Sequence, residues 1–88
     1  MINMVKVKLF ANFREVVGKN EIEISATTVL DLLIKLANEY PELKRLIFRD
    51  NKISDYVNVA INCEIVQNLN TKLKENDVVA IFPPVSGG

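Results

Sequence analysis

The stretch Val78-Val79-Ala80-Ile81-Phe82, followed at once by Pro83 and Pro84, decides the fold of this chain. Five consecutive apolar residues are typical of a strand that is apolar on both faces, and such a strand usually lies in the middle of a sheet. The polar stretch Lys74-Glu75-Asn76-Asp77 before it predicts a turn. Because proline lacks the amide donor that a sheet needs, we expect the strand to end at Phe82.

Alternation of apolar and polar residues predicts the strands around this central one. They are residues 4–10 with Val5, Val7 and Leu9 inward, residues 21–25 with Ile22 and Ile24 inward, and a third strand with Val57, Val59 and Ile61. A turn at residues 62–64 leads into a short fourth strand that contains Ile65 and Val66. Charged residues share the outer face of the first two strands, and we interpret them as structural ion pairs: Lys6, Lys8, Glu21 and Glu23.

Helical spacing of apolar residues predicts one long helix that covers the sheet. Thr28 caps it, and Asp31 faces the same free amides. Its buried stripe is Val29, Leu32, Leu33, Leu36, Ala37 and Tyr40, and Pro41 ends it. Short helical turns are expected over residues 11–17, which stop at Gly18, and around Leu43, Leu46 and Ile47, before a polar connection from Arg49 to Asp55. We interpret Lys44, Arg45 and Arg49 as a solvated face.

These elements predict an α+β domain in which one main helix packs on one face of a mixed sheet of about five strands. Residues 1–82 are expected to form this domain, because an 88-residue chain has no material for a second core. Residues 83–88 are expected to form an extended, flexible tail.

Composition excludes several classes of function. Eleven basic residues balance eleven acidic ones, which argues against a partner that is a nucleic acid or a membrane surface. No apolar run approaches the roughly 18 residues of a membrane span, and no signal peptide is recognisable, so we expect a cytoplasmic protein. The lone Cys63 and the absence of histidine exclude an internal disulfide, a zinc cluster of cysteines and histidines, and a histidine-activated nucleophile.

The tail Pro83-Pro84-Val85-Ser86-Gly87-Gly88 is where we expect the chemistry. Two of the three glycines are the last two residues. The prolines favour an extended segment that can reach about 20 Å, and glycines without side chains can pass through a narrow channel. The reactive group would then be the α-carboxylate of Gly88, which a nucleotide-dependent partner could convert to an acyl-adenylate. A frayed, inert terminus is the structural alternative.

These residues resemble a known family. The Gly87-Gly88 ending on such a domain is similar to the ubiquitin-like β-grasp proteins, and the whole tail resembles the MoaD family, which provides the small subunit of molybdopterin synthase. The internal motifs that carry the resemblance are Phe10-Ala11 with Arg14-Glu15, Ala60-Ile61-Asn62, and Asn76-Asp77-Val78-Val79-Ala80. Asn76 stands where the family often has glycine, a position that asparagine can also occupy in a turn.

The resemblance implies a sulfur carrier. An E1-like enzyme would use ATP to adenylate Gly88, a sulfur donor would convert it to a thiocarboxylate, and the large synthase subunit would use the sulfur to build molybdopterin from a cyclic pyranopterin in a heterotetramer. The catalytic groups would come from the large subunit, and the carrier itself would bind no cofactor or metal. Gly87 would give clearance, while the partner-binding residues implied are Phe10, Ile65, Phe82, Pro83, Pro84, Val85 and Ser86.

Three alternatives remain open from the sequence. The same thiocarboxylate could serve thiamine synthesis or tRNA thiolation. A ubiquitin-like modifier would instead join Gly88 to a lysine of a target protein. An interaction module with an inert tail would need neither Gly87 nor Gly88. The final metal, molybdenum or tungsten, is not encoded in these residues.

Overall fold

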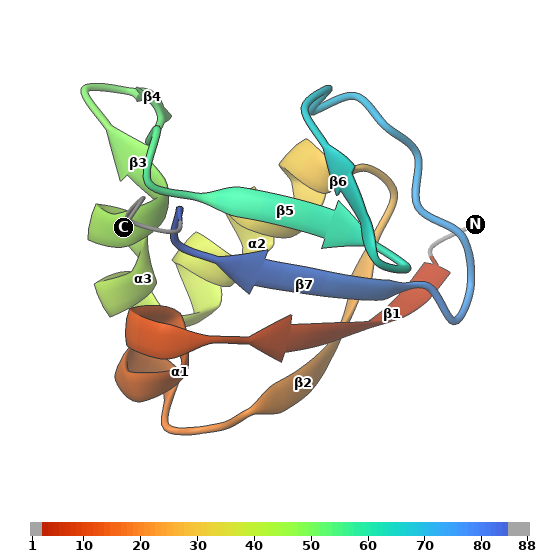
Figure 1. The fold of residues 1–88 in the computed structure, drawn as a ribbon, viewed down its shortest axis with the longest axis horizontal. Helices are drawn as coiled ribbons and strands as arrows, with labels where there is room; N and C mark the ends of the chain where they lie inside the picture. Colours follow the sequence, from red (N-terminus) through yellow and green to blue (C-terminus); the bar gives the residue numbers. More distant parts are fainter. Residues whose placement is uncertain (1–2, 85–88) are drawn as a thin grey trace.

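The computed structural model describes residues 3–84 (Figure 1). In chain order the elements are β1 (Asn3–Leu9), α1 (Ala11–Val17), β2 (Glu21–Ala26), α2 (Val29–Glu39), α3 (Pro41–Ile47), β3 (Phe48–Arg49), β4 (Lys52–Ile53), β5 (Asn58–Ile61), β6 (Glu64–Val66) and β7 (Val78–Phe82). Five strands form a sheet in the order β2-β1-β7-β5-β6, in which only β1 and β7 run parallel. The predicted central position of β7 is therefore confirmed.

The two faces of this sheet differ because α2 and α3 lie behind only one of them (Figure 1). On β7 the side chains of Val79 and Ile81 are completely buried. Those of Val78, Ala80 and Phe82 point to the opposite face and are only half-buried. The apolar character of β7 on both faces thus has two causes: one face fills the core, and the other forms part of an open surface.

The core lies between the helices and the covered face of the sheet. The predicted stripe of α2 is confirmed. Tyr40 is partly buried against the core, and the other five residues of the stripe are buried: Val29, Leu32, Leu33, Leu36 and Ala37. Phe13 of α1 and Leu43 and Ile47 of α3 extend the same core. The longest helix, α2, has eleven residues, and no helix within residues 3–84 is long and apolar enough to cross a membrane.

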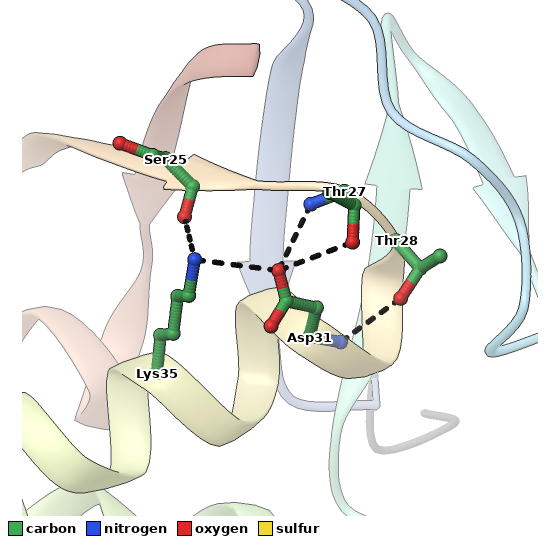
Figure 2. A network of polar contacts seen from close by, with 5 residues as sticks. All are labelled: Ser25, Thr27, Thr28, Asp31 and Lys35. Carbon is green, nitrogen blue, oxygen red and sulfur yellow. Dashed lines mark hydrogen bonds and ion pairs between the residues drawn. The ribbon is translucent and has the colours of Figure 1, made fainter. Parts of the chain in front are cut away.

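A network of polar contacts joins the start of α2 to the end of β2 (Figure 2). The Thr28 hydroxyl accepts a hydrogen bond from the Asp31 N–H at 3.1 Å, and the Asp31 carboxylate accepts from the Thr27 N–H at 2.9 Å. One turn further on, the Lys35 ammonium lies 3.4 Å from that carboxylate and donates to the Ser25 carbonyl at 2.8 Å. The capping that the sequence predicts at Thr28 and Asp31 is confirmed, and Lys35 extends it to the sheet.

This network lowers the pKa of Asp31 below its ordinary value of 3.8. The hydrogen bond from the Thr27 backbone is the largest cause, and the positive charge of Lys35 adds to it. Partial burial of the carboxyl acts in the opposite direction. Both stabilising contacts favour the ionised form, so Asp31 supports the helix as a carboxylate.

One local expectation is confirmed, and another needs correction. Pro41 does follow the long helix, but it is also the first residue of α3, where proline is tolerated because its missing N–H has no partner there in any case. The connection expected to be irregular contains the β3–β4 hairpin, whose turn residues Asp50 and Asn51 have φ values of 52° and 65°. Strands of two residues are too short for alternation to reveal them.

Candidate functional site

The open face of the sheet carries a row of directly paired residues. Lys8 of β1 pairs with Ala80 of β7, Ala80 with Ala60 of β5, and Ala60 with Ile65 of β6. Directly paired residues on neighbouring strands point to the same face. The row therefore runs across four strands, from a charge on β1 to an exposed isoleucine on β6.

Two aromatic side chains form a second row that lies next to this one. Phe82 lies two residues after Ala80 on β7 and therefore points to the same face. The Phe10 N–H donates to the Ile81 carbonyl at 3.2 Å, which continues the β1–β7 ladder and places Phe10 next to Phe82. Phe10 is 43% exposed and Ile65 is 68% exposed.

We call these five residues the open-face patch: Phe10, Ala60, Ile65, Ala80 and Phe82. The structure brings the three large residues expected from the sequence to one face. The two alanines between them escaped the sequence analysis. Their signal was available, since Ala60 and Ala80 lie at even spacing from other open-face residues.

Pro83 and Pro84 lie outside the sheet, directly after the patch. Pro83 is half-buried and Pro84 is exposed. The residues Val85, Ser86, Gly87 and Gly88, to which the sequence assigns partner contacts and the reactive carboxylate, lie outside the described residues. The part of the tail that the structure describes therefore starts at the edge of the open-face patch.

The other half of the open face is charged. Lys6 pairs with Glu23 and Lys8 with Glu21 across the two strands, and the Lys6 ammonium lies 3.6 Å from the Glu21 carboxylate. The predicted arrangement of opposite charges is thus confirmed. Such exposed pairs contribute little to stability.

Two internal motifs of the resemblance meet at the far end of the sheet, where they fix turns. The Asn62 side chain donates to the Asp77 carboxylate and accepts from the Val78 N–H, both at 3.0 Å. Asp77 also accepts from the Lys74 N–H at 2.7 Å. Asn76 adopts φ 69°, a left-handed conformation that asparagine tolerates. These residues therefore hold the loop before β7 against the β5–β6 turn.

The described residues hold little that could catalyse a reaction. Ser54 and Asp77 are the buried polar side chains within residues 3–84, and both are hydrogen bonded in turns. No group of three potential metal ligands exists in that part of the chain. Arg14, Glu15 and Cys63 are exposed on the surface. What the arrangement offers is a docking surface and the start of a tail.

Comparison with known proteins agrees with this architecture. The model of the ThiS family matches residues 7–88. Small archaeal modifier protein 3 of Haloferax volcanii is 38% identical, over 96% of this chain and 98% of its own length. The molybdopterin synthase sulfur carrier subunit of Dictyostelium discoideum is 34% identical over the whole of both chains.

Solved structures show the same fold. The solution structure of small archaeal modifier protein 1 from Methanosarcina acetivorans matches with a TM-score of 0.90 and 39% identity, covering 100% of this chain and 99% of that one. A chain from the complex of subunits 1 and 2 of molybdopterin-converting factor of Helicobacter pylori matches with a TM-score of 0.68 and 29% identity, covering 97% and 99%. The predicted ubiquitin-like β-grasp fold is confirmed. From its fold and from these matches, the chain belongs to the ThiS family, a group of small sulfur carriers and ubiquitin-like modifiers.

Proposed function

We propose that this chain is a sulfur carrier that supplies molybdopterin synthesis as the small subunit of the synthase. The observation that carries the proposal is the position of the open-face patch at the root of a tail that ends in Gly87-Gly88. Full-length similarity to a molybdopterin synthase sulfur carrier subunit supports the choice of pathway.

The chemistry resides in the terminal carboxylate of Gly88. Its oxygen attacks the α-phosphorus of ATP on an E1-like enzyme, pyrophosphate leaves, and an acyl-adenylate forms. Hydrosulfide released by a sulfur donor then attacks the acyl carbon, the bond to AMP breaks and AMP leaves, which yields the thiocarboxylate. The large synthase subunit transfers this sulfur to a cyclic pyranopterin. Gly87 leaves room for these enzymes, because it presents no side chain to a narrow channel.

The open-face patch supplies the docking energy in this proposal. Phe10 and Phe82 are large apolar anchors, and the small side chains of Ala80 and of Ala60, which is buried, lie between them and Ile65. Aromatic anchors near the centre of an interface contribute most of its binding energy. Pro83, Pro84, Val85 and Ser86 follow the patch and would line the entry into the partner. A complex of two small and two large subunits would be the working assembly.

A second candidate function is protein modification. Similarity to two small archaeal modifier proteins supports it as directly as the carrier relative supports the first. In that role a lysine amine attacks the same adenylated Gly88, and the product is an isopeptide rather than a thiocarboxylate. Both functions share adenylation, so the fate of the acyl group distinguishes them.

The decisive test is intact and C-terminal peptide mass spectrometry after incubation with the E1-like enzyme, ATP and a sulfur donor. We expect one oxygen of Gly88 to be replaced by sulfur, and we expect the loaded chain to yield molybdopterin when the large subunit and the cyclic pyranopterin are added. A chain truncated after Gly87 is the control. Lysine conjugates without any thiocarboxylate would instead establish the modifier.

The patch has a matched control within the same chain. Phe10 is 43% exposed and lies in the patch, whereas Ile34 is 42% exposed and lies on α2. Phe10→Ala should weaken binding to the large subunit by roughly tenfold or more, because truncation of an interface anchor costs above about 1.4 kcal/mol. Ile34→Ala should leave binding unchanged, as measured by titration calorimetry. Equal effects of the two variants would argue against the patch.

A further inference from the structure

We propose that a basic cluster on the β3–β4 hairpin and the end of α3 docks an acidic surface of the enzyme that adenylates the tail. The basic cluster consists of Lys44, Arg45, Arg49 and Lys52. This inference rests on the proposed function, in both its carrier and its modifier form, because adenylation of Gly88 begins each of them. It concerns a surface separate from the open-face patch.

The first observation is an uneven distribution of charge. Residues 44–52 hold four of the eleven basic residues and one of the eleven acidic residues of a chain whose net charge is zero. All four basic side chains are exposed. The ion pairs among residues 3–84 are Lys6–Glu21 and Lys35–Asp31, so none of the four basic residues forms an ion pair within that part of the chain.

The second observation is an unfavourable cross-strand pair. Arg49 of β3 lies directly opposite Lys52 of β4, and like charges at such positions destabilise a hairpin. The register cannot slip to relieve the repulsion, because the neighbouring pair Phe48 and Ile53 packs against the core. The fold therefore holds Arg49 and Lys52 opposite each other, and neither forms an ion pair within residues 3–84. An anionic surface on another molecule would convert this repulsion into attraction.

The third observation is the position of the cluster relative to the tail. β5 begins at Asn58, directly opposite Phe82, so the segment that leads from the hairpin into β5 lies at the end of the sheet where the tail begins. Figure 1 shows the β3–β4 hairpin at the end of the sheet toward which β7 points. A protein that surrounds the root of the tail therefore meets the open-face patch on one side and the hairpin on the other.

Hydrogen bonds fix the hairpin in this position. The Ser54 N–H donates to the Ile47 carbonyl at 2.7 Å, and the Ser54 hydroxyl accepts from the Tyr56 N–H at 3.0 Å. Tyr56 is 61% exposed and borders a hollow of about 280 Å³ that is lined by the cations Arg49 and Lys52 and by the carboxylates Asp50 and Asp55. Tyrosine and arginine are both enriched at protein interfaces.

Charges at the rim of an interface act mainly on the rate of encounter. They attract an oppositely charged partner over about one Debye length, which is roughly 10 Å at 0.1 M salt and 3 Å at 1 M. The cluster should therefore raise kcat/KM for the carrier in adenylation and make it sensitive to salt. It should leave kcat unchanged, because charges at the rim of an interface act on the encounter and not on the chemical step.

The test is ATP–pyrophosphate exchange by the E1-like enzyme at varied concentrations of the full-length carrier and two salt concentrations. The double variant Arg49→Glu with Lys52→Glu should lower kcat/KM about tenfold at about 0.05 M salt, and the difference should nearly disappear at about 1 M. Lys72→Glu with Lys74→Glu is the matched control. It changes the net charge equally, but these lysines lie in the segment before β7, at the opposite end of the sheet.

A neutral variant separates docking from folding. Arg49→Gln with Lys52→Gln removes the repulsion, so it should raise the temperature of unfolding slightly while it lowers kcat/KM. A residue pair with a purely structural role would not raise the unfolding temperature and lower kcat/KM at the same time.

Five outcomes are decisive. Loss of kcat/KM in the hairpin variants alone supports the inference. Equal loss in the Lys72 and Lys74 control would show a net-charge effect and overturn it, as would no loss in any variant. Binding of the wild-type chain to tRNA that the hairpin variants abolish would assign the cluster to RNA instead. Failure of the wild-type chain to support exchange would overturn the proposed function together with this inference.

Discussion

Replacement of Asp31 by alanine should destabilise the domain in a way that depends on pH. The carboxylate accepts the Thr27 N–H at 2.9 Å, lies 3.4 Å from the Lys35 ammonium and sits in the first turn of α2. A partly exposed cap contributes about 1 kcal/mol, an exposed pair one turn apart about 0.3–0.5, and the helix dipole about 0.3–1. Alanine has a higher helix propensity than aspartate, which recovers about 0.5 kcal/mol of stability. The net loss should be about 1–2 kcal/mol.

The pH dependence follows from the direction of the pKa shift. The folded pKa of Asp31 lies below 3.8, so the unfolded chain binds more protons near that pH and stability rises with pH there. The contribution of the carboxylate is complete above the unfolded pKa of about 3.9 and is lost as the pH falls through the folded value. The variant should therefore unfold about 4–15 °C below the wild type at about pH 7, and the difference should be smaller at a pH below 3.8.

Thermal unfolding followed by circular dichroism measures both quantities. Glu39→Ala is the control, because Glu39 is an exposed carboxylate at the other end of α2, where it gains nothing from the helix dipole. That variant should change stability by less than about 0.5 kcal/mol. A loss for Asp31→Ala of equal size at both pH values would refute this account, as would an equal loss in the control.

Three further variants test how the fold is held. Leu36→Ala should cost about 2–5 kcal/mol in urea unfolding because Leu36 is completely buried, and a cost below about 1 kcal/mol would contradict the assigned core. Cys63→Gly should stabilise the β5–β6 turn by up to about 1 kcal/mol, since Cys63 holds φ 73°; a lower unfolding temperature would oppose this. Gly18→Ala should destabilise by about 1 kcal/mol through its φ of 80° alone, because no atom lies within 4 Å of the added methyl group; unchanged calorimetric stability would count against backbone strain there.

Local patterns predicted the elements of the core well. The stripe from Val29 to Ala37 and the cap at Thr28 depend on neighbours within one or two helical turns, so the sequence contains their full description. The short β3 and β4 strands were missed because two residues carry no period, and their pairing depends on packing against α3 and the core.

The candidate site was predicted in its chemistry but not in its shape. Gly88 and the proline-led tail can be recognised from residue types alone, and Phe10, Ile65 and Phe82 from the family resemblance. Even spacing could have indicated the face on which Ala60 and Ala80 lie, but only strand register brings them together, because it aligns residues that lie twenty positions apart.

The sequence by itself determined that one α+β domain forms around a central apolar strand, because periodicity and capping act over a few residues. Only the tertiary structure decided which face of that strand stays open and which charged segment lies at the end of the sheet where β7 ends (Figure 1). Those properties depend on contacts between distant segments, such as Asn58 with Phe82 and Phe10 with Ile81. Arg49 illustrates the difference, since the sequence analysis interprets it as part of a solvated face, whereas in the fold it lies on a hairpin at the end of the sheet where β7 ends (Figure 1).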